Sequence, residues 1–203
     1  MKINLHKGDL PKGLDLGSLV AVDTETLGLN LHRDRLCLVQ LSGGDGQAHL
    51  VQLGSGNYKA PNLKKLLRDR KVTKLYHFAR FDLAVILRYL RVVAAPVYCT
   101  RTASKLVRTY SDRHGLKDLV KELLDVDLSK QQQSSDWGAE TLSEQQLAYA
   151  ANDVAYLHKL KESLDEMLRR DGRVELANAC FRFLPTRAAL DLAGWAETDI
   201  FSH

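Results

Sequence analysis

The feature that most constrains the fold is a set of three short apolar runs separated by tight turns. Leu19–Val22 leads into the polar stretch 23–26, and Leu36–Leu41 and Ala48–Leu53 follow it. The glycine-rich segment Gly43–Gly46 joins the second and third runs. Runs of this length predict strands, and connections this short favour antiparallel neighbours. The sequence therefore predicts an antiparallel meander in the first part of the chain.

The rest of the chain alternates strand-like and helical segments. Two further strands are predicted around 73–77 and 97–99, each followed by apolar residues at helical spacing. Ser143 and Gln146 have the spacing of a capping box at the start of the clearest helix. Helices are expected over 63–68 with Asn62 as cap, 81–90, 101–110, 116–124, 143–168 and 175–184. This order predicts an α/β fold whose mixed sheet has three antiparallel strands followed by parallel strands, flanked by helices.

Length and composition set the remaining bounds. The 203 residues, 45% of them apolar, suffice for a single domain over 1–203 with a short C-terminal helical extension. Cys37, Cys99 and Cys180 are far apart and odd in number, so we expect buried, reduced thiols. No apolar run approaches the ~20 residues of a membrane span, and the start lacks the apolar centre of a signal peptide, so we expect a cytoplasmic location. The net charge of +4 permits a nucleic-acid substrate without demanding one.

Two carboxylates stand at the end of the first apolar run. Alternation along a strand places Asp23 and Glu25 on one face and Thr24 on the other. Two acids that share a face repel each other and raise each other's pKa unless a cation lies between them. A solvated strand end explains the same pattern, because a lone pair of acids with this spacing is common.

Two more acids lie on predicted helices. Asp82 is in a first helical turn, where the helix dipole alone favours an acid. Asp153 is in the middle of a helix, at the edge of its apolar stripe, and Tyr149 lies one turn earlier on the same face. A carboxylate at the edge of a buried stripe requires a partner, which is either a basic side chain or a metal ion.

Together the four acids indicate phosphodiester hydrolysis with two divalent ions. Such a reaction needs a water activated near neutral pH and stabilisation of the developing negative charge, and a pair of metal ions supplies both. Mg²⁺ and Mn²⁺ prefer carboxylate oxygens. Tyr149, with an ordinary pKa of about 10, is a poor general base and suits the orientation of the attacking water.

The three segments that carry these residues resemble the exonuclease motifs of the DEDD superfamily. The segments are Val22–Thr26, His77–Asp82 and Tyr149–Val154, and the spacing of Tyr149 and Asp153 is that of the tyrosine branch, which includes ribonuclease D. The histidine branch would place its histidine at position 148, where this chain has Ala148. The resemblance implies an RNase H-like fold, with Asp23, Glu25, Asp82 and Asp153 as metal ligands, Asp23 bridging, and Tyr149 orienting the water.

A closer resemblance, to the nanoRNase C family, extends over nearly the whole chain. It rests on residues 23–41, Arg113–Lys117, Ser129–Trp137 and Leu190–Trp195. The resemblance implies a Mg²⁺- or Mn²⁺-dependent 3′→5′ exoribonuclease that degrades short oligoribonucleotides, with dinucleotides favoured, and assembles as a ring-shaped octamer. The chain after the long helix is too short for the additional helical domains of ribonuclease D, and we therefore expect a compact enzyme for small substrates.

Several residues beside the acids are candidates for substrate contacts. Thr26 and Leu27 follow the acidic strand, and Leu27 suits either a wedge between the last two bases or core packing. His77 and Phe78 are candidates for contacts with ribose, phosphate or base, and stacking on an aromatic ring stabilises a bound base by roughly 1–3 kcal/mol. Core packing is the alternative for Phe78.

Basic and polar residues extend this set of candidates. Arg101, Lys105 and Arg108 have the spacing of one basic stripe on a helix, which suits a 5′-phosphate, a neighbouring subunit or a solvated face. Gln133, Ser135 and Trp137 lie in a glutamine-rich segment that resembles one near the active site of ribonuclease D relatives. An ordinary polar loop anchored by Trp137 is the alternative.

Three functions stay open on the sequence. The first is an exonuclease for short RNA. The second is the same chemistry on tRNA 3′ ends or DNA, since metal ions act on a phosphodiester whatever the sugar. The third is a binding module without catalytic activity, against which the four acids argue, because clustered negative charge repels a phosphate.

Overall fold

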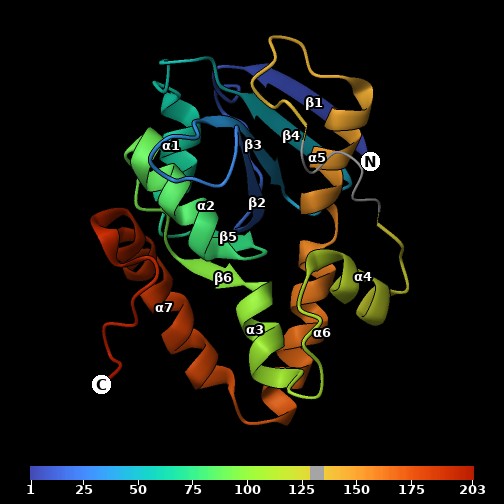
Figure 1. Ribbon diagram of the computed structural model, residues 1–203. Helices are drawn as coiled ribbons and strands as arrows, with labels where there is room; N and C mark the ends of the chain where they lie inside the picture. Colours follow the sequence, from blue (N-terminus) through green and yellow to red (C-terminus); the bar gives the residue numbers. More distant parts are fainter. Residues whose placement is uncertain (129–134) are drawn as a thin grey trace.

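The computed structural model describes residues 1–128 and 135–203, and a six-stranded mixed sheet lies at its centre (Figure 1). The strand order is β1-β4-β3-β2-β5-β6. The strands are β1 (Lys2–Lys7), β2 (Leu19–Thr26), β3 (Leu36–Ser42), β4 (Gln47–Gln52), β5 (Thr73–Tyr76) and β6 (Val97–Cys99). The α-helices are α1 (Pro61–Arg68), α2 (Ala79–Val85), α3 (Thr100–Val107), α4 (Leu116–Leu124), α5 (Glu144–Ala155), α6 (Leu157–Arg170) and α7 (Val174–Leu190). Two π-helical turns, η1 (Ile86–Leu90) and η2 (Asp191–Trp195), continue α2 and α7.

The sheet has the predicted mixed topology. Strands β2, β3 and β4 form the antiparallel meander. Strand β5 adds to β2 and β6 adds to β5, both in parallel and both through helical connections. Helix α5 packs on β2, β3 and β4, while α2 packs on β2 and β5. Every residue of β3 is buried, because helices and loops cover both faces of the sheet centre. Asp23 and Glu25 therefore belong to a strand whose position is fixed by neighbours on both sides.

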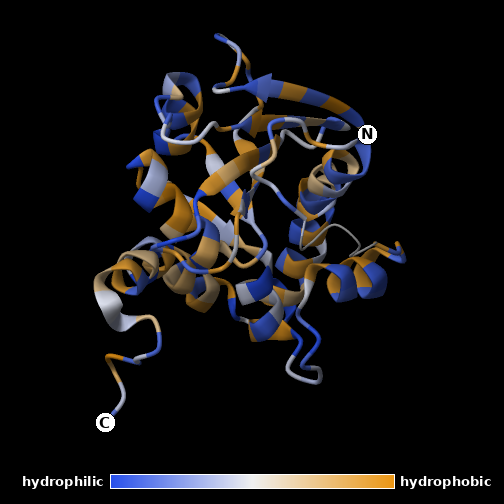
Figure 2. Cartoon of the chain, turned by 45° about the horizontal axis from the view of Figure 1, so that its top comes forward, coloured by the Kyte–Doolittle hydropathy of each residue, from blue (hydrophilic) through white to orange (hydrophobic). Residues whose placement is uncertain are grey.

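The sequence analysis missed the edge strand β1, which pairs in parallel with β4. Its side chains are exposed or half-buried, and hydrophilic and hydrophobic residues alternate along it (Figure 2). Such a strand lacks the apolar run that revealed the inner strands. Its pairing depends on the free edge of β4, which no local pattern reveals.

The predicted cap of α1 is wrong. The backbone amides of Asn62 and Leu63 both donate to the carboxylate of Asp9, each at 2.9 Å. The side chain of Asn62 points elsewhere and donates to the carbonyl of Leu10 at 2.9 Å. The cap comes from a residue more than fifty positions earlier, and capping rules that look only at neighbouring residues do not find it.

The long C-terminal helix of the prediction is two helices. Its start is as expected, since the Ser143 hydroxyl accepts from the Gln146 amide at 3.2 Å and the Gln146 side chain accepts from the Ser143 amide at 2.9 Å. The helix breaks at Tyr156, so α5 carries the candidate residues and α6 begins a separate apolar stripe. Helix α7 passes through Pro185 and ends at Leu190, later than predicted, whereas α3 ends at Val107, earlier than predicted.

The structure also tests the expectations for the cysteines and for a membrane span. All three cysteines are free thiols; Cys37 and Cys99 are buried, whereas Cys180 is only half-buried, which corrects the expectation for that residue. Within the described residues, no helix combines the length and apolar character required to cross a membrane.

Candidate active site

One cleft of about 640 Å³ gathers all five candidate catalytic residues from three elements. Strand β2 supplies Asp23 and Glu25, the first turn of α2 supplies Asp82, and α5 supplies Tyr149 and Asp153. The cleft lies where β2 ends and α2 begins, so residues far apart in the sequence meet at the C-terminal end of this inner strand.

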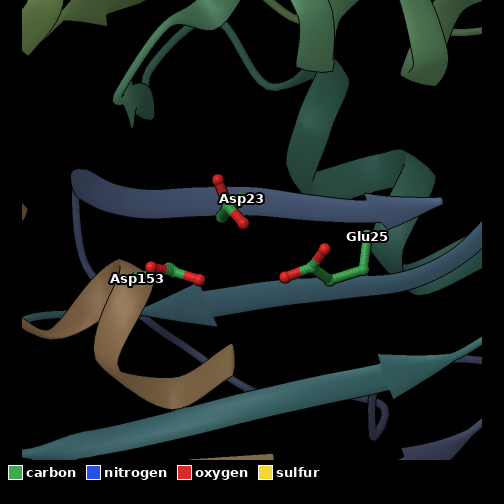
Figure 3. Close-up of side chains that lie close together, drawn as sticks. All are labelled: Asp23, Glu25 and Asp153. Atoms are coloured by element: carbon green, nitrogen blue, oxygen red, sulfur yellow. The ribbon is translucent and has the colours of Figure 1, made fainter. Parts of the chain in front are cut away.

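Three of the carboxylates are close enough to share a cation. One oxygen from each of Asp23, Glu25 and Asp153 lies within 4.8 Å of the others. Figure 3 shows that the Glu25 and Asp153 carboxylates extend toward one another beside Asp23, with the two strand residues on one face of β2 and Asp153 on α5. This is the face relationship that strand alternation predicted for Asp23 and Glu25.

Asp82 approaches the same group from α2 but lies outside this trio. It is buried, and one of its oxygens accepts from the Thr24 hydroxyl at 2.6 Å. Thr24 is on the opposite face of β2 from Asp23 and Glu25, as predicted, and it fixes Asp82 at the strand end. This side-chain hydrogen bond links β2 to the first turn of α2.

Burial and mutual repulsion raise the pKa values of the carboxylates in the cluster. Burial raises the pKa of Asp23 to about 7. Burial, followed by repulsion from Asp23, Asp153 and Asp82, raises the pKa of Glu25 to about 10. The pKa values of Asp82 and Asp153 are also raised, first by burial and then by the charge of Asp23. In residues 1–128 and 135–203, no lysine or arginine forms an ion pair with any of these acids, so the salt bridge considered for Asp153 is absent there.

This arrangement fits a divalent metal site. The donors are hard carboxylate oxygens from separate elements, the ligand set that Mg²⁺ and Mn²⁺ prefer. A bound cation would remove the repulsion that raises the pKa values of the four acids. The charge and the spacing of the donors therefore match the two-ion chemistry expected from the sequence.

Tyr149 stays protonated near neutral pH. Burial, followed by the negative charges of Asp153, Glu25 and Asp23, raises the pKa of its hydroxyl above the ordinary value. Its ring is next to Trp137, with 6.1 Å between centroids. A phenol in this state donates a hydrogen bond and does not act as a base.

Gln40 was missed by the sequence analysis. It is fully buried in β3, directly opposite Asp23 in the strand register, and its amide donates to Asp23 at 3.2 Å. The available signal was a polar amide inside an apolar strand. A buried amide of this kind needs a partner, and here the partner is a candidate ligand.

The candidate substrate contacts surround the acids. Leu27 is 51% exposed and Phe78 is 45% exposed, so the core-packing alternative is wrong for both. Phe78 has a left-handed backbone, with φ at 67°, and the Arg101 guanidinium lies 5.0 Å from its ring centroid. The lining of the cleft also includes Thr26, His77, Ser135 and Trp137.

His77 and Trp137 each direct a polar atom without a partner into a buried environment. The Nδ1 atom of His77 lies 2.9 Å from the Thr100 hydroxyl, and its Nε2 atom is unpartnered among the described residues. Burial, followed by the charge of Arg101, lowers the pKa of His77 to about 3, so the ring is neutral. Trp137 is buried, and within the same residues its indole nitrogen has no partner.

Two of the proposed basic contacts do not reach the cleft. Lys105 is exposed and does not line it. Arg108 is fully buried beyond the end of α3, where it pairs with Glu122 and donates to the carbonyl of Arg113 at 2.6 Å. The predicted stripe of three is therefore wrong, because the helix ends before Arg108 and the side chain turns inward.

Lys117, at the start of α4, lines the cleft and was missed as a contact. Its signal was its place in the segment Arg113–Lys117, which carried the closer family resemblance. Gln133 lies outside the described residues.

A second cleft, of about 730 Å³, is larger but has different chemistry. It lies between β6, α6 and α7, and the only acid in its described lining is Asp165. Asp165 already accepts from Lys161 at 2.5 Å and from the Tyr98 hydroxyl at 2.8 Å. We therefore place the active site in the smaller cleft, which holds the unpaired acids.

Comparison with known proteins agrees with this geometry. The 3′-5′ exonuclease family model matches residues 9–169. The structure of Brucella melitensis NrnC with bound Mg²⁺ is 59% identical, with a TM-score of 0.96, and the match covers 100% of each chain. The structure of Brucella melitensis NrnC bound to pGG is 60% identical, with a TM-score of 0.97, and covers 100% of this chain and 99% of that one. Ribonuclease D of Gluconacetobacter diazotrophicus is 38% identical over 156 residues, which are 77% of this chain and 39% of that relative.

The chain belongs to the 3′-5′ exonuclease family, and its fold is the RNase H-like mixed sheet of that family. Within the family it groups with NrnC, with which it aligns over its whole length. It spans about two fifths of the length of the ribonuclease D relatives that it matches.

Proposed function

We propose that this protein is a metal-dependent 3′→5′ exoribonuclease that degrades very short RNA, dinucleotides above all, to mononucleotides. The observation that carries the proposal is the group of four buried or half-buried acids that meet in one cleft without an ion pair to any described lysine or arginine. The relative bound to pGG supports the substrate class, since a 60% identical chain of the same length holds a dinucleotide.

In this proposal Asp23, Glu25, Asp82 and Asp153 would hold two Mg²⁺ or Mn²⁺ ions, and the family resemblance implies the bridging role for Asp23. The ions supply a nucleophilic water near neutral pH and offset the charge that develops on the phosphate. Gln40 fixes the Asp23 carboxylate through its amide, and Thr24 fixes that of Asp82. Tyr149, protonated at neutral pH, donates a hydrogen bond that orients the attacking water.

The walls of the cleft suit a substrate of one or two bases. Leu27 and Phe78 expose apolar side chains at its rim, where they can separate or stack bases. Arg101, beside the Phe78 ring, and Lys117, elsewhere in the lining, supply positive charge to the cleft and suit a phosphate. A cleft of about 640 Å³ is within the range typical of small-ligand sites.

The test uses 5′-labelled RNAs of about two, three, seven and twenty nucleotides, with Mg²⁺, with Mn²⁺ and with EDTA, beside the Asp153→Ala variant. These lengths separate a dinucleotide from substrates that extend beyond a small-ligand cleft. We expect fast, metal-dependent cleavage of the dinucleotide that slows with length and is absent in the variant. Rapid shortening of the longest RNA with the dinucleotide intact would instead indicate ribonuclease D-like processing of tRNA 3′ ends. Cleavage of DNA alone would move the assignment to a DNA exonuclease, and no cleavage at all would favour the binding module.

The assembly follows from the family resemblance. We propose a homo-oligomer, ring-like and octameric, built from chains in which residues 1–203 form one domain with α7 and η2 as its C-terminal extension. Sedimentation at micromolar concentration tests the assembly, and a monomer there contradicts it. Because very short RNA arises where RNA is degraded, we propose that the enzyme acts in the cytoplasm.

A further inference from the structure

The C-terminal extension lies outside the matched exonuclease region but touches the helix that carries Asp82. The family match ends at residue 169, and α7 and η2 follow it. Helix α7 packs along α2, and η2 continues it beside the same helix (Figure 1). Between η2 and α2 the contact is a charged one, and it is centred on Asp191, the first residue of η2.

Asp191 is a buried acid with two arginine partners. Its side chain is 4% exposed, and it accepts from Arg80 of α2 in a bidentate pair, with atom separations of 2.6 and 2.9 Å. Arg187, one turn earlier on α7, donates to the same carboxylate at 2.5 Å. Arg80 also donates to the carbonyl of Ala196 at 2.6 Å. A bidentate arginine–carboxylate pair fixes orientation as well as distance.

The first turn of α2 follows a backbone conformation that is unfavourable for its N-cap residue. Its N-cap, Phe78, is a non-glycine residue in the left-handed region, with φ at 67°, and its side chain makes no capping hydrogen bond. A backbone of this kind is held only where the surrounding structure over-determines it, because it is disfavoured for a residue with a side chain. Arg80 lies two residues after Phe78 and two before Asp82, and its side chain is the charged link from this turn to η2.

We propose that Asp191 is a positioning residue for the active site: through Arg80 it fixes the first turn of α2 and, with it, the carboxylate of Asp82. The proposal rests on the assignment of Asp82 as a metal ligand. Groups that orient ligands in this way typically contribute 10–100-fold to metal affinity or activity. Asp191 and Arg80 contact neither substrate nor metal in this scheme and act only through α2.

The experiment is a Mn²⁺ titration, by calorimetry, of the EDTA-treated and dialysed protein and its variants. We expect Arg80→Met and Asp191→Asn each to weaken Mn²⁺ binding by roughly tenfold or more. We expect the double variant to be no worse than the poorer single variant, because both act through one contact. Arg187→Met is the matched control, since it removes a partner of Asp191 that lies on α7 itself, and its Mn²⁺ affinity should stay within about twofold of the wild type.

The proposal is overturned if Arg80→Met binds Mn²⁺ like the wild type, or if Arg187→Met loses as much affinity at equal loss of melting temperature. Where Arg80→Met does not fold, Arg80→Lys keeps the charge but not the bidentate geometry, and an intermediate loss of Mn²⁺ affinity is then expected. Asp82→Asn distinguishes a failure of the metal assignment from a failure of the positioning role. If it leaves Mn²⁺ binding unchanged, the metal assignment fails and this proposal falls with it. If Asp82→Asn weakens binding while the arginine variants do not, only the positioning role is refuted.

Discussion

Asp191 and the four acids of the cleft have opposite electrostatic surroundings. Asp191 lies between two arginines and is a satisfied ion-pair centre. Of the four acids of the cleft, Asp82 is buried and the other three are half-buried. The only side-chain hydrogen bonds identified for them within the described residues come from Gln40 and Thr24, which are neutral. Burial without a counter-charge is unfavourable, and selection retains it only where a cation or a protonated state completes the site. What separates a structural acid from a functional one is therefore the charge of the groups around it, and not the degree to which it is buried.

The largest effect is expected from removing one acid of the cleft. Asp153→Asn should lower exonuclease activity by roughly 10³-fold or more, since catalytic groups that act as a unit fail together. The metal-free variant should unfold at the same temperature as the wild type or higher, because the change relieves repulsion with Asp23 and Glu25. A dinucleotide assay and a thermal melt in EDTA measure both. A melting temperature well below that of the wild type would mean that Asp153 is a structural acid like Asp191.

The next effect is a dependence of stability on pH in the metal-free protein. The pKa of Asp23 is about 7 in the folded chain, above its ordinary value of 3.8, so between these pH values the folded state binds more protons than the unfolded state. The contribution of Asp23 to the free energy of unfolding is therefore largest below pH 4. It falls as the pH rises toward 7, by an amount on the order of 4 kcal/mol. Urea unfolding in EDTA across this range measures the slope.

Asp23→Asn is the matched control for that slope and should reduce it, while the raised pKa values of the other three acids keep part of it. Asp191→Asn should leave it in place, since Asp191 does not line the cleft. Excess Mg²⁺ should also reduce the fall, because a ligand that binds only the folded state stabilises it, by about 2.7 kcal/mol at a hundred times its dissociation constant. A slope of the wild-type size in Asp23→Asn would contradict the assignment.

Asp191→Asn should destabilise the fold, in contrast to Asp153→Asn. Removing one partner of a buried ion pair costs about 3–5 kcal/mol, and the lower end applies because Arg80 is 37% exposed. Chemical denaturation at pH 7 measures this difference. Equal stability of Asp191→Asn and the wild type would remove the distinction between the two acid groups.

The smallest effect concerns the rim of the cleft. Phe78→Ala removes an exposed ring against which Arg101 packs, so it should cost about 1–3 kcal/mol of dinucleotide binding, with little change in stability. The expected sign is a higher KM with metal affinity unchanged. Phe78→Leu keeps a large apolar side chain without the π-face, and recovery of the KM in that variant would argue against stacking.

The sequence revealed the parts of the fold and site that follow from local periodicity and spacing. The shared face of Asp23 and Glu25 and the capping box at Ser143 arise from contacts within a few residues, and the meander joins strands that follow one another in the chain. The motif order carried the family resemblance in the same way. These features are readable because neighbouring residues determine them through strand alternation and helical pitch.

Tertiary structure decided the features that depend on residues distant in the chain. Asp9 caps α1, β1 pairs with β4 as the edge strand, and Arg108 turns inward to Glu122, none of which a local pattern predicts. Gln40 becomes a partner of Asp23 only because β3 pairs with β2 in one register. The sequence by itself determined which acids could hold a metal, since ligand chemistry belongs to the residue type. Only the folded chain decided that four of them meet without an ion pair to any described lysine or arginine, whereas Asp191 meets two arginines, because the energy of a charge withdrawn from water depends on what surrounds it.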